Sequence, residues 1–415
     1  MELKYFFETL SRGIRREMKI ALVSQIFPVR EQPYRGHSVF QTALRLRQWA
    51  DVRAISPHAS YPSWLKPKTR LWSSTDLSYS PEGIPTKYCS YPALPVLSRV
   101  TNGSLCARAI EPLIAADLPD VILSYWVYPD GFAAARVGRR LGIPVVIKAI
   151  GTDINDLRGP VHKALSRKAL QDASFCLTVS EDLRRKIIAM GIGAERVQAI
   201  SNGCDTSVFY VQDRELARKE LGLSLDGRLV VYVGRYDIAK GLVELLNAVP
   251  KIAAAHPRLT VALVGDGPAR PELEGHVTRL GIQDHVKFVA PCRSSGVAKW
   301  MAASDLFTLP SYREGCPNVV IEALSCGKPV VAANVGGVPD LVDDECGILV
   351  PPRDAEALAR AISAALGRTW DCEAISQRRR RSWEQVAAET FEICASVLPV
   401  QSGAYAAARS AGVLR

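Results

Sequence analysis

Residues 311–322 read Ser-Tyr-Arg-Glu-Gly-Cys-Pro-Asn-Val-Val-Ile-Glu and follow the apolar run 306–309. An apolar run, a polar turn and an apolar-periodic segment predict a strand, a loop and a helix, and Pro317 suits the first helical turn. In an open parallel α/β sheet such a loop lies at the carboxyl end of its strand, where ligands bind and where helix N–H groups attract anions. Glu314 on the loop and Glu322 in the helix are therefore predicted to face one ligand site.

The neighbours of this stretch decide how the two glutamates are interpreted. Isolated glutamates on a loop and a helix are more often ordinary surface charges. Here a turn at 327–329 feeds another buried strand, and Gly336-Gly337 stands where backbone can approach a ligand closely. This context favours a binding site.

Length and composition set the class of protein. A chain of 415 residues exceeds what one core usually holds, so two domains are expected, and 48% hydrophobic with 23% charged residues is typical of a soluble globular protein. Neither an 18-residue apolar run nor a secretory signal is present, which predicts a cytoplasmic protein. The ten cysteines contain no C-x-x-C pair and are expected to be reduced core residues (Cys176, Cys326 and Cys394 among them). No metal site is predicted.

Positive charge is concentrated in the first half of the chain. Residues 1–205 contain 28 Lys and Arg against 18 Asp and Glu, whereas residues 206–415 contain 24 of each. A basic face could meet nucleic acid, an anionic membrane surface or an acidic substrate. The aromatic-interleaved basic motifs of nucleic-acid modules are absent, so a membrane surface or a lipid-phosphate acceptor is preferred, with a plain solvated surface as the equal alternative.

The first half opens like a nucleotide-type α/β domain. Residues 1–17 are an extension, either an amphipathic segment that touches a membrane or the product of an upstream start codon. A strand at 19–24 leads through a loop that bears Gly36 to a helix that His37 or Ser38 opens. The G-x-G-x-x-G fingerprint of a dinucleotide site is absent, which disfavours a dehydrogenase.

Strands and helices then alternate to the end of the first half. An irregular loop at 57–80 could shape an acceptor pocket. A strand at 121–128 ends in Pro129-Asp130-Gly131, a helix follows at 132–141, and a strand at 144–150 ends in Gly151-Thr152-Asp153. This alternation predicts a doubly wound parallel sheet.

A second alternating set begins near residue 206. A buried strand at 229–234 is followed by the loop 235–241 and a helix whose apolar face starts at Leu242. Basic residues on a loop are usually solvated. Arg235 and Lys240, however, stand between a strand end and a helix start, where a cationic pair adds to the free N–H groups and could hold a diphosphate without a metal ion.

The ordered set of motifs resembles a known family. It consists of Gly234-Arg235 with Lys240-Gly241, Gly265-Asp266-Gly267-Pro268, Glu314 with Glu322, Gly336 to Asp340, and Gly347 to Pro351. In this order the motifs resemble those of the family 4 retaining nucleotide-sugar glycosyltransferases, over about residues 18–394. Tyr128 to Gly131 and Gly151 to Asn155 look like the branch that builds bacterial surface polysaccharides such as teichuronic acid.

The resemblance implies the fold and the roles of the site residues. The fold would be GT-B, two Rossmann-like doubly wound parallel-sheet domains facing across a cleft. Arg235 and Lys240 would bind the donor diphosphate and offset charge on the leaving group. Glu314 would hold the donor sugar, Glu322 the ribose hydroxyls, and backbone from Phe288 to Pro291 the base. The remaining expected contacts are Gly234, Gly315, Cys316, Pro317 and Asn318 for the donor, and Gly36, His37, Asp130, Thr152 and Asp153 for the acceptor.

One position departs from the family. Many members have His before the Gly-x-Asp turn, whereas this chain has Ile150, which cannot transfer a proton. Retention in the family is described as a front-face reaction in which the leaving phosphate takes the acceptor proton, so activity could survive, with Asp153 and the cations carrying more of the positioning. His37 is a possible substitute, although a lone loop histidine is more often merely exposed.

The domain plan and the activity follow from the resemblance. The expected parts are the extension 1–17, an acceptor domain 18–205, a nucleotide-sugar domain 206–370, a helix crossing back at 371–400, and a flexible tail 401–415. The expected reaction is metal-independent and cofactor-free transfer from a nucleotide sugar, a UDP-sugar by preference, to a glycan or lipid-linked acceptor, by an enzyme that could sit on the cytoplasmic face of the membrane. The alternatives are a sugar-phosphate synthase with a soluble acceptor and a nucleotide-sugar-binding protein that has lost catalysis.

Overall fold

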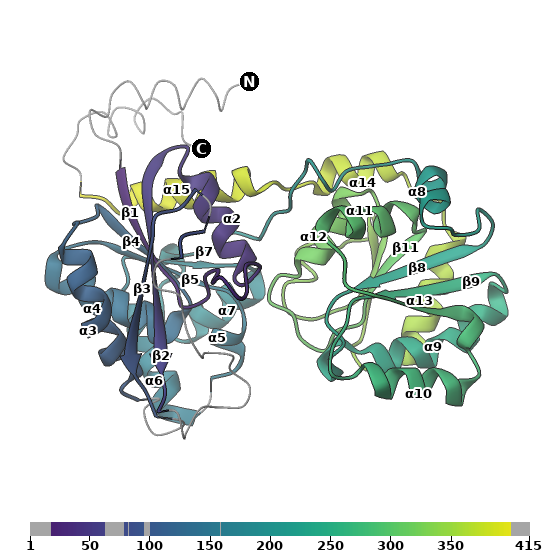
Figure 1. Cartoon of the computed structure of the whole chain (residues 1–415), viewed down its shortest axis with the longest axis horizontal. Coiled ribbons are helices and arrows are strands. Elements are labelled where there is room, and N and C mark those ends of the chain that lie inside the picture. Colours follow the sequence, from purple (N-terminus) through teal and green to yellow (C-terminus); the bar gives the residue numbers. More distant parts are fainter. Residues whose placement is uncertain (1–17, 63–78, 82, 95–99, 158, 400–415) are drawn as a thin grey trace. The chain divides into compact units, whose positions relative to one another are not determined.

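The computed structural model of the chain describes residues 18–62, 79–81, 83–94, 100–157 and 159–399. These residues form two compact units, each built on its own parallel sheet (Figure 1). The second unit comprises residues 179–185 and 201–386, and the first comprises the rest. The predicted extension 1–17, the tail 401–415 and most of the predicted loop 57–80 lie outside the described residues.

The first unit contains a sheet of seven parallel strands in the order β3-β2-β1-β4-β5-β6-β7. The order reverses between β1 and β4, and in open α/β sheets ligands bind outside the carboxyl ends of the strands at such a switch point. The strands are β1 (Met18–Val23), β2 (Ala50–Ser60), β3 (Thr86–Pro92), β4 (Val121–Tyr125), β5 (Val145–Ala149), β6 (Phe175–Thr178) and β7 (Val197–Ala199).

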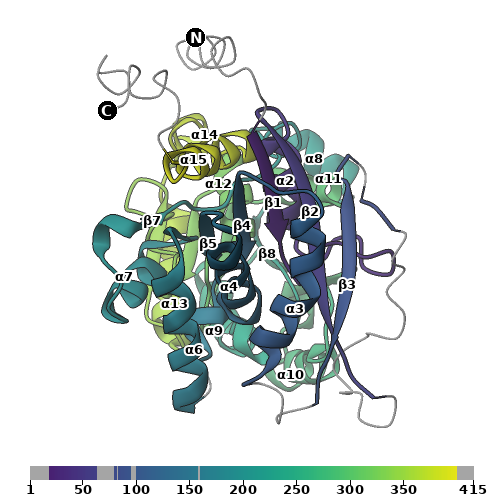
Figure 2. The ribbon, with the colours of Figure 1, turned by 90° about the vertical axis from the view of Figure 1, so that its left-hand side faces the viewer.

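Helices cover the first sheet, because its central strands are apolar on both faces and must be buried on both. Figure 2 shows α3, α4 and α6 side by side in front of the strands. The helices are α2 (His37–Leu46), α3 (Asn102–Ala115), α4 (Phe132–Leu141), α5 (Thr152–Asn155), α6 (Gly159–Asp172) and α7 (Glu181–Ala189), with the short turns η3 (Val127–Gly131) and η4 (Ala194–Arg196). Helix α7 is divided between the units, because its residues up to Arg185 belong to the second.

The second unit contains a sheet of six parallel strands in the order β10-β9-β8-β11-β12-β13, with its switch point between β8 and β11. The strands are β8 (Arg228–Val233), β9 (Leu259–Val264), β10 (Val286–Val289), β11 (Leu306–Leu309), β12 (Val330–Ala333) and β13 (Gly347–Val350). Two parallel, doubly wound sheets confirm the predicted fold class.

The helices of the second unit form two layers. One layer packs α9, α10 and α13 together, and the other pairs α8 with α11 and α12 with α14 (Figure 1). They are α8 (Arg214–Glu220), α9 (Leu242–Ala255), α10 (Arg270–Leu280), α11 (Ser294–Ala303), α12 (Asn318–Ser325), α13 (Ala355–Gly367) and α14 (Cys372–Arg379), with η5 (Ile238–Lys240) and η6 (Gln283–His285). The final helix α15 (Trp383–Ser396) belongs to the first unit from Ala387 on.

Two strand ends differ from the prediction. Strand β2 runs on to Ser60 and includes Pro57, which the sequence places in a loop. Its register with β1 stops at Ile55, so beyond that residue β2 pairs with β3 on one side only, and a residue without an N–H is tolerated there. Strand β4 ends at Tyr125 rather than at residue 128, because Trp126 has φ 82° and turns the chain into η3.

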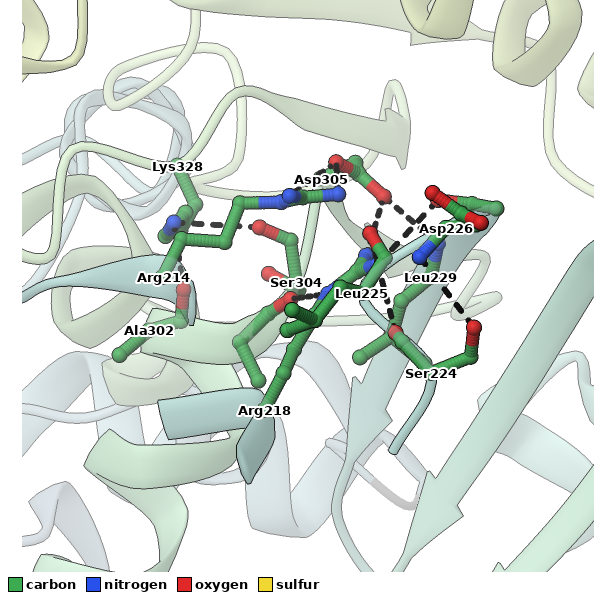
Figure 3. Close-up of polar contacts among 12 residues, drawn as sticks. Arg214, Arg218, Ser224, Leu225, Asp226, Leu229, Ala302, Ser304, Asp305 and Lys328 are labelled. Atoms are coloured by element: carbon green, nitrogen blue, oxygen red, sulfur yellow. Dashed lines mark hydrogen bonds and ion pairs between the residues drawn. The ribbon is translucent and has the colours of Figure 1, made fainter. Parts of the chain in front are cut away.

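A buried polar cluster closes the second sheet at the amino ends of β8 and β11. Figure 3 shows Arg214 and Arg218 converging on Asp305. Arg218 is 2% exposed, and besides its bond to Asp305 it donates to four backbone carbonyls. The amide of Leu229 also donates to Asp305, at 2.7 Å. Paired and hydrogen-bonded in this way, the buried charges are tolerated, and they lie at the edge of the sheet opposite to the ligand site predicted at its carboxyl end.

Candidate functional site

The loops that follow β8 and β11 meet at the switch point of the second sheet. The Nζ atom of Lys240, in η5, lies 2.7 Å from Oε1 of Glu314, and the two side chains are 29% and 11% exposed. The residues are far apart in the chain, and the neighbouring positions of β8 and β11 bring them together. The structure thus places a predicted diphosphate-binding cation beside a predicted sugar-binding acid.

Glycine is required where these loops touch. A Cβ atom on Gly241, which has φ 64°, would lie 2.0 Å from the carbonyl oxygen of Pro310. A Cβ atom on Gly336, with φ 53°, would lie 1.8 Å from the carbonyl oxygen of Glu314. Any other residue at these positions would push the loops apart. The Gly336-Gly337 motif is therefore part of the same site as Glu314.

Two helices start at this site. Helix α9 begins after Gly241 and helix α12 after Pro317, and in neither does a side chain cap the first turn. The first N–H groups of a helix attract anions when they lack intrahelical partners. Together with Lys240, the two helix starts form a positive region beside the sugar-binding acid.

Arg235 lies on the same edge of the sheet and is exposed to solvent. Its carbonyl oxygen accepts a hydrogen bond from the hydroxyl of Tyr232 at 3.0 Å. Burial raises the pKa of Tyr232, and the nearby charge of Glu314 raises it further. Tyr232 therefore holds the backbone of the Arg235 loop, a bond that the sequence did not reveal.

Glu322 lies within α12, where it is largely covered. Burial raises the pKa of its carboxyl to about 7. A carboxyl with such a pKa changes its charge near neutral pH, and hydrogen bonds from ligand hydroxyls would favour the charged form. The position fits the predicted contact with ribose, which stays a prediction.

Residues 315–318 are held by a side chain that sequence reasoning missed. The Nδ2 atom of Asn202 donates to Oδ1 of Asn318 at 2.8 Å and to the carbonyl of Cys316 at 3.4 Å. The amide of Asn202 also lies 3.4 Å from the Cys316 sulfur. Asn202 precedes Cys316 by 114 residues, so no local sequence pattern indicates this contact.

The predicted base-reading segment lies on the outer strand β10. The ring of Phe288 packs edge-to-face against Tyr236, with ring centroids 6.1 Å apart, and the guanidinium of Arg270 lies 5.8 Å from the Phe288 centroid. Pro291 is exposed beyond the end of the strand. Strand β9 separates β10 from β8, so the predicted contact with the base remains a prediction.

The first unit carries two buried carboxyls at its own switch point. Asp130 is fully buried and its Oδ2 atom accepts a hydrogen bond from the amide of Gln25 at 2.6 Å. Asp153 is 4% exposed and accepts hydrogen bonds from three backbone amides (Val127, Ile150 and Gly151). Burial raises the pKa of Asp153 to about 6 and that of Asp130 well above its ordinary value.

These bonds join the loops that follow β1, β4 and β5. In this structure the two side chains present almost no surface to a ligand, so both carboxyls hold loops and Asp130 is not placed to touch an acceptor directly. Asp153 accepts a hydrogen bond from the amide of Gly151 and so holds that loop, and the positioning role expected of it in the reaction stays a prediction. Gly36 has φ 62° and precedes α2, whereas His37 and Thr152 are exposed. Their acceptor contacts remain predictions.

A cavity of about 280 Å³ lies elsewhere in the second unit. Its lining includes none of the predicted site residues. Arg378 and Arg379 on its wall pair with Glu345 and Asp343. In the part of the chain that the structure describes, no group of three or more His, Cys, Asp or Glu side chains is placed to hold a metal ion.

Comparison with known proteins places the chain in a family. Residues 227–368 match the model of the glycosyl transferases group 1, and residues 35–203 match that of the glycosyl transferase 4-like domain. TuaC of Bacillus subtilis, whose name assigns it to teichuronic acid biosynthesis, is 32% identical over 362 residues, which are 83% of this chain and 88% of TuaC. A D-inositol 3-phosphate glycosyltransferase of a Nocardioides species is 33% identical over 328 residues, covering 70% of this chain and 71% of that enzyme.

The chain therefore belongs to the group 1 glycosyltransferase family, and the resemblance noted in its motifs is confirmed. It is a glycosyltransferase, which disfavours the alternative of a protein that only binds its ligand.

Solved structures agree on the fold. HepE of Anabaena in complex with UDP-glucose has a TM-score of 0.67 at 23% identity and covers 91% of this chain and 100% of HepE. Sucrose-phosphate synthase of Thermosynechococcus elongatus has a TM-score of 0.70 at 22% identity and covers 92% of this chain and 99% of that enzyme. At this level of identity the likeness supports the GT-B fold and nothing finer.

Proposed function

We propose that the chain transfers a sugar from a nucleoside diphosphate, UDP by preference, to a glycan or lipid-linked acceptor of a cell-surface polysaccharide. The transfer is proposed to proceed with retention at the anomeric carbon and without a metal ion or other cofactor. The observation that carries the proposal is the Lys240–Glu314 pair at the switch point of the second sheet, beside the starts of α9 and α12.

The residues present supply the charges that this reaction needs. The ammonium of Lys240 has three N–H donors, so it can bond a phosphate oxygen while it keeps its bond to Glu314. Lys240, Arg235 and the helix starts offset the charge that develops on the leaving diphosphate, a task that a divalent cation performs in other transferases. Glu314 accepts hydrogen bonds from the hydroxyls of the donor sugar.

The fate of the acceptor proton follows from Ile150. This side chain carries no titratable group, and Asp153 is occupied by three backbone amides. As the acceptor oxygen forms its bond to the anomeric carbon and the bond to the phosphate oxygen breaks, the acceptor proton passes to that leaving phosphate oxygen. The cations make the exchange favourable by holding the leaving group on the same face of the sugar.

The acceptor is proposed to lie at a cytoplasmic membrane surface. Residues 1–205 contain 28 basic and 18 acidic residues. This excess of positive charge supports attraction to anionic lipid or to a lipid phosphate. Within the described residues, no helix has the length and apolar character that crossing a membrane requires. The names of TuaC and of the UDP-glucose complex of HepE are the reasons for choosing a surface glycan and a uridine donor.

A panel of nucleotide sugars tests the donor assignment. A ligand that binds the folded state raises the melting temperature, and we expect the largest rise with a UDP-sugar. The best donor is then supplied with lipid-linked glycan or with a soluble sugar phosphate. Transfer to the lipid-linked glycan with an unchanged anomeric configuration supports the proposal. Transfer to the sugar phosphate alone identifies a synthase instead, and donor binding without transfer to any acceptor contradicts the proposed activity.

A further inference from the structure

Tyr312 is fastened at both its backbone and its side chain. Its amide donates a hydrogen bond to the carbonyl of Ala239 at 2.8 Å. Its hydroxyl lies 2.7 Å from each carboxylate oxygen of Glu244, which belongs to the first turn of α9. The loop after β11 is thus attached to the turn after β8 at one point and to the helix after that turn at another.

A third loop covers the ring of Tyr312. The guanidinium of Arg353, which follows β13, lies 4.6 Å from the ring centroid. Arg353 has φ 62°, a left-handed conformation that is unfavourable for residues other than glycine. Such a conformation persists where surrounding contacts impose it, and the stacked guanidinium is one such contact. The ring therefore lies between the starts of α9 and α13.

The neighbours of Tyr312 do not hold the loop in the same way. The hydroxyl of Ser311 is buried and has no hydrogen-bond partner among the described residues. Arg313 is exposed. Burial, together with the hydrogen bond to Glu244, raises the pKa of Tyr312 to about 12, so the hydroxyl keeps its proton and continues to donate. Between residues 311 and 313, Tyr312 supplies the side-chain bond that fixes the path toward Glu314.

We propose that Tyr312 is a positioning residue for the donor site: its bond to Glu244 holds the loop so that Glu314 stands beside Lys240. This inference rests on the proposed function, because it assigns the Lys240–Glu314 pair to the donor. Glu314 follows Tyr312 by two residues, and Lys240 follows Ala239 directly, so the fastening lies next to both members of the pair. Loss of the bond would let the loop move and would weaken the hold on the donor sugar.

Four single variants test the bond. Tyr312→Phe and Glu244→Ala remove it, whereas Glu244→Gln keeps an oxygen acceptor and Tyr210→Phe removes a hydroxyl from a tyrosine that is 45% exposed. The dissociation constant of the nucleotide sugar that the wild-type chain binds best, with UDP-glucose tried first, is measured by calorimetry. We expect it to rise by about tenfold in the first two variants, which lose the hydrogen bond altogether, and by less than about twofold in the other two, which keep a hydrogen bond between residues 312 and 244.

A second background shows whether Tyr312 acts through Glu314. In Glu314→Gln, the further change Tyr312→Phe should raise the dissociation constant by less than about twofold, since coupled residues are not additive. A full additional tenfold loss would show that Tyr312 acts elsewhere, and wild-type affinity in Tyr312→Phe would overturn the inference. If Tyr312 had a merely structural role, Tyr312→Phe would lower the melting temperature, and its effect on the dissociation constant would not depend on whether Glu314 is present.

Hydrogen exchange tests the positioning without a donor. The amides of residues 314–316 should exchange faster in Tyr312→Phe than in wild type, while those of β8 and β11 stay unchanged. Unchanged exchange across the loop would reject the fastening even if donor binding fell. If the wild-type chain binds no nucleotide sugar, the proposed function fails, and the exchange result still decides whether Tyr312 holds the loop.

Discussion

The loops at the two switch points of this chain are held together by different interactions. In the first unit, the loop after β1 meets the turn after β4 through the amide of Gln25 and the fully buried carboxyl of Asp130. In the second unit, the corresponding loops after β8 and β11 meet through Lys240 and Glu314, an ion pair that solvent can reach. The same topology therefore places a buried hydrogen bond at one switch point and a solvent-accessible ion pair at the other.

The difference separates a structural carboxyl from one that can bind a ligand. Burial raises the pKa of Asp130 and favours its neutral form, whereas the hydrogen bond from the amide of Gln25 acts in the opposite direction. A phosphate or a hydroxyl can still reach the partly exposed Lys240–Glu314 pair.

The largest effect is expected from removing the cations of the second unit. Lys240→Ala and Arg235→Ala should each lower kcat/KM for sugar transfer by about 10² to 10³-fold, because preorganised charge at the leaving group is lost. Lys251→Ala is the matched control, since Lys251 lies on α9 and forms an exposed pair with Glu356. Steady-state rates of the three variants decide the matter, and equal rates in Lys240→Ala and Lys251→Ala would remove the diphosphate assignment.

The buried pair of Arg218 and Asp305, at the amino ends of β8 and β11, should contribute to the stability of the fold. Asp305→Ala leaves the buried guanidinium of Arg218 without its carboxylate and is expected to lower the free energy of unfolding by about 3 kcal/mol. Asp226→Ala removes the partner of Arg258 in a pair whose side chains are 78% and 76% exposed, and should change it by less than about 0.5 kcal/mol. Urea denaturation of both variants measures the difference. A similar loss in both would show that burial is not the cause.

The buried hydrogen bond between Gln25 and Asp130 in the first unit should contribute to stability, and its loss should leave donor binding unchanged. Asp130→Ala leaves the amide of Gln25 without its acceptor and should lower the free energy of unfolding by about 2 kcal/mol. Asp130→Asn, which resembles the neutral carboxyl, should lower it by less than about 1 kcal/mol because an acceptor oxygen remains. Urea denaturation compares the two, and calorimetry with the nucleotide sugar should give wild-type affinity for both. Weakened donor binding would break the contrast between the switch points.

The smallest effect concerns pH and Glu322. Burial raises the pKa of this carboxyl to about 7, so it is protonated below that pH and charged above it. Because the charged form accepts stronger hydrogen bonds from ribose hydroxyls, donor affinity should rise by up to about tenfold from pH 6 to pH 8. Glu322→Gln should abolish this dependence. Calorimetry across the pH range gives the answer, and an equally steep rise in the variant would assign the dependence to another group.

Local patterns were enough to predict most of the architecture. The apolar runs and their turn residues predicted β11 at 306–309, the helix α4 at 132–141 and the alternation of strands and helices, because each rests on neighbouring residues. The strand-to-helix order also predicted that Lys240 and Glu314 lie at one edge of a sheet. The motifs of the family, found in order, then supplied the roles.

Contacts between residues far apart in the chain could not be predicted from the sequence. The hydrogen bond from Tyr312 to Glu244 and the pairing of Asp305 with Arg218 depend on packing across many residues, and no local pattern encodes them. The burial of Asp130 was missed for the same reason, since its partner Gln25 lies on another strand's loop. Trp126 at φ 82° gave no signal either, because only glycine announces such a conformation in a sequence.

Calorimetric titration of a UDP-sugar into wild type, Lys240→Ala and Asp130→Asn measures whether the charges at the second switch point hold the donor. If the charges at the second switch point hold the donor, wild type and Asp130→Asn bind with the same affinity, and Lys240→Ala shows no measurable heat of binding. Wild-type affinity in Lys240→Ala, or a loss of binding in Asp130→Asn alone, would contradict the placement of the donor at the second switch point.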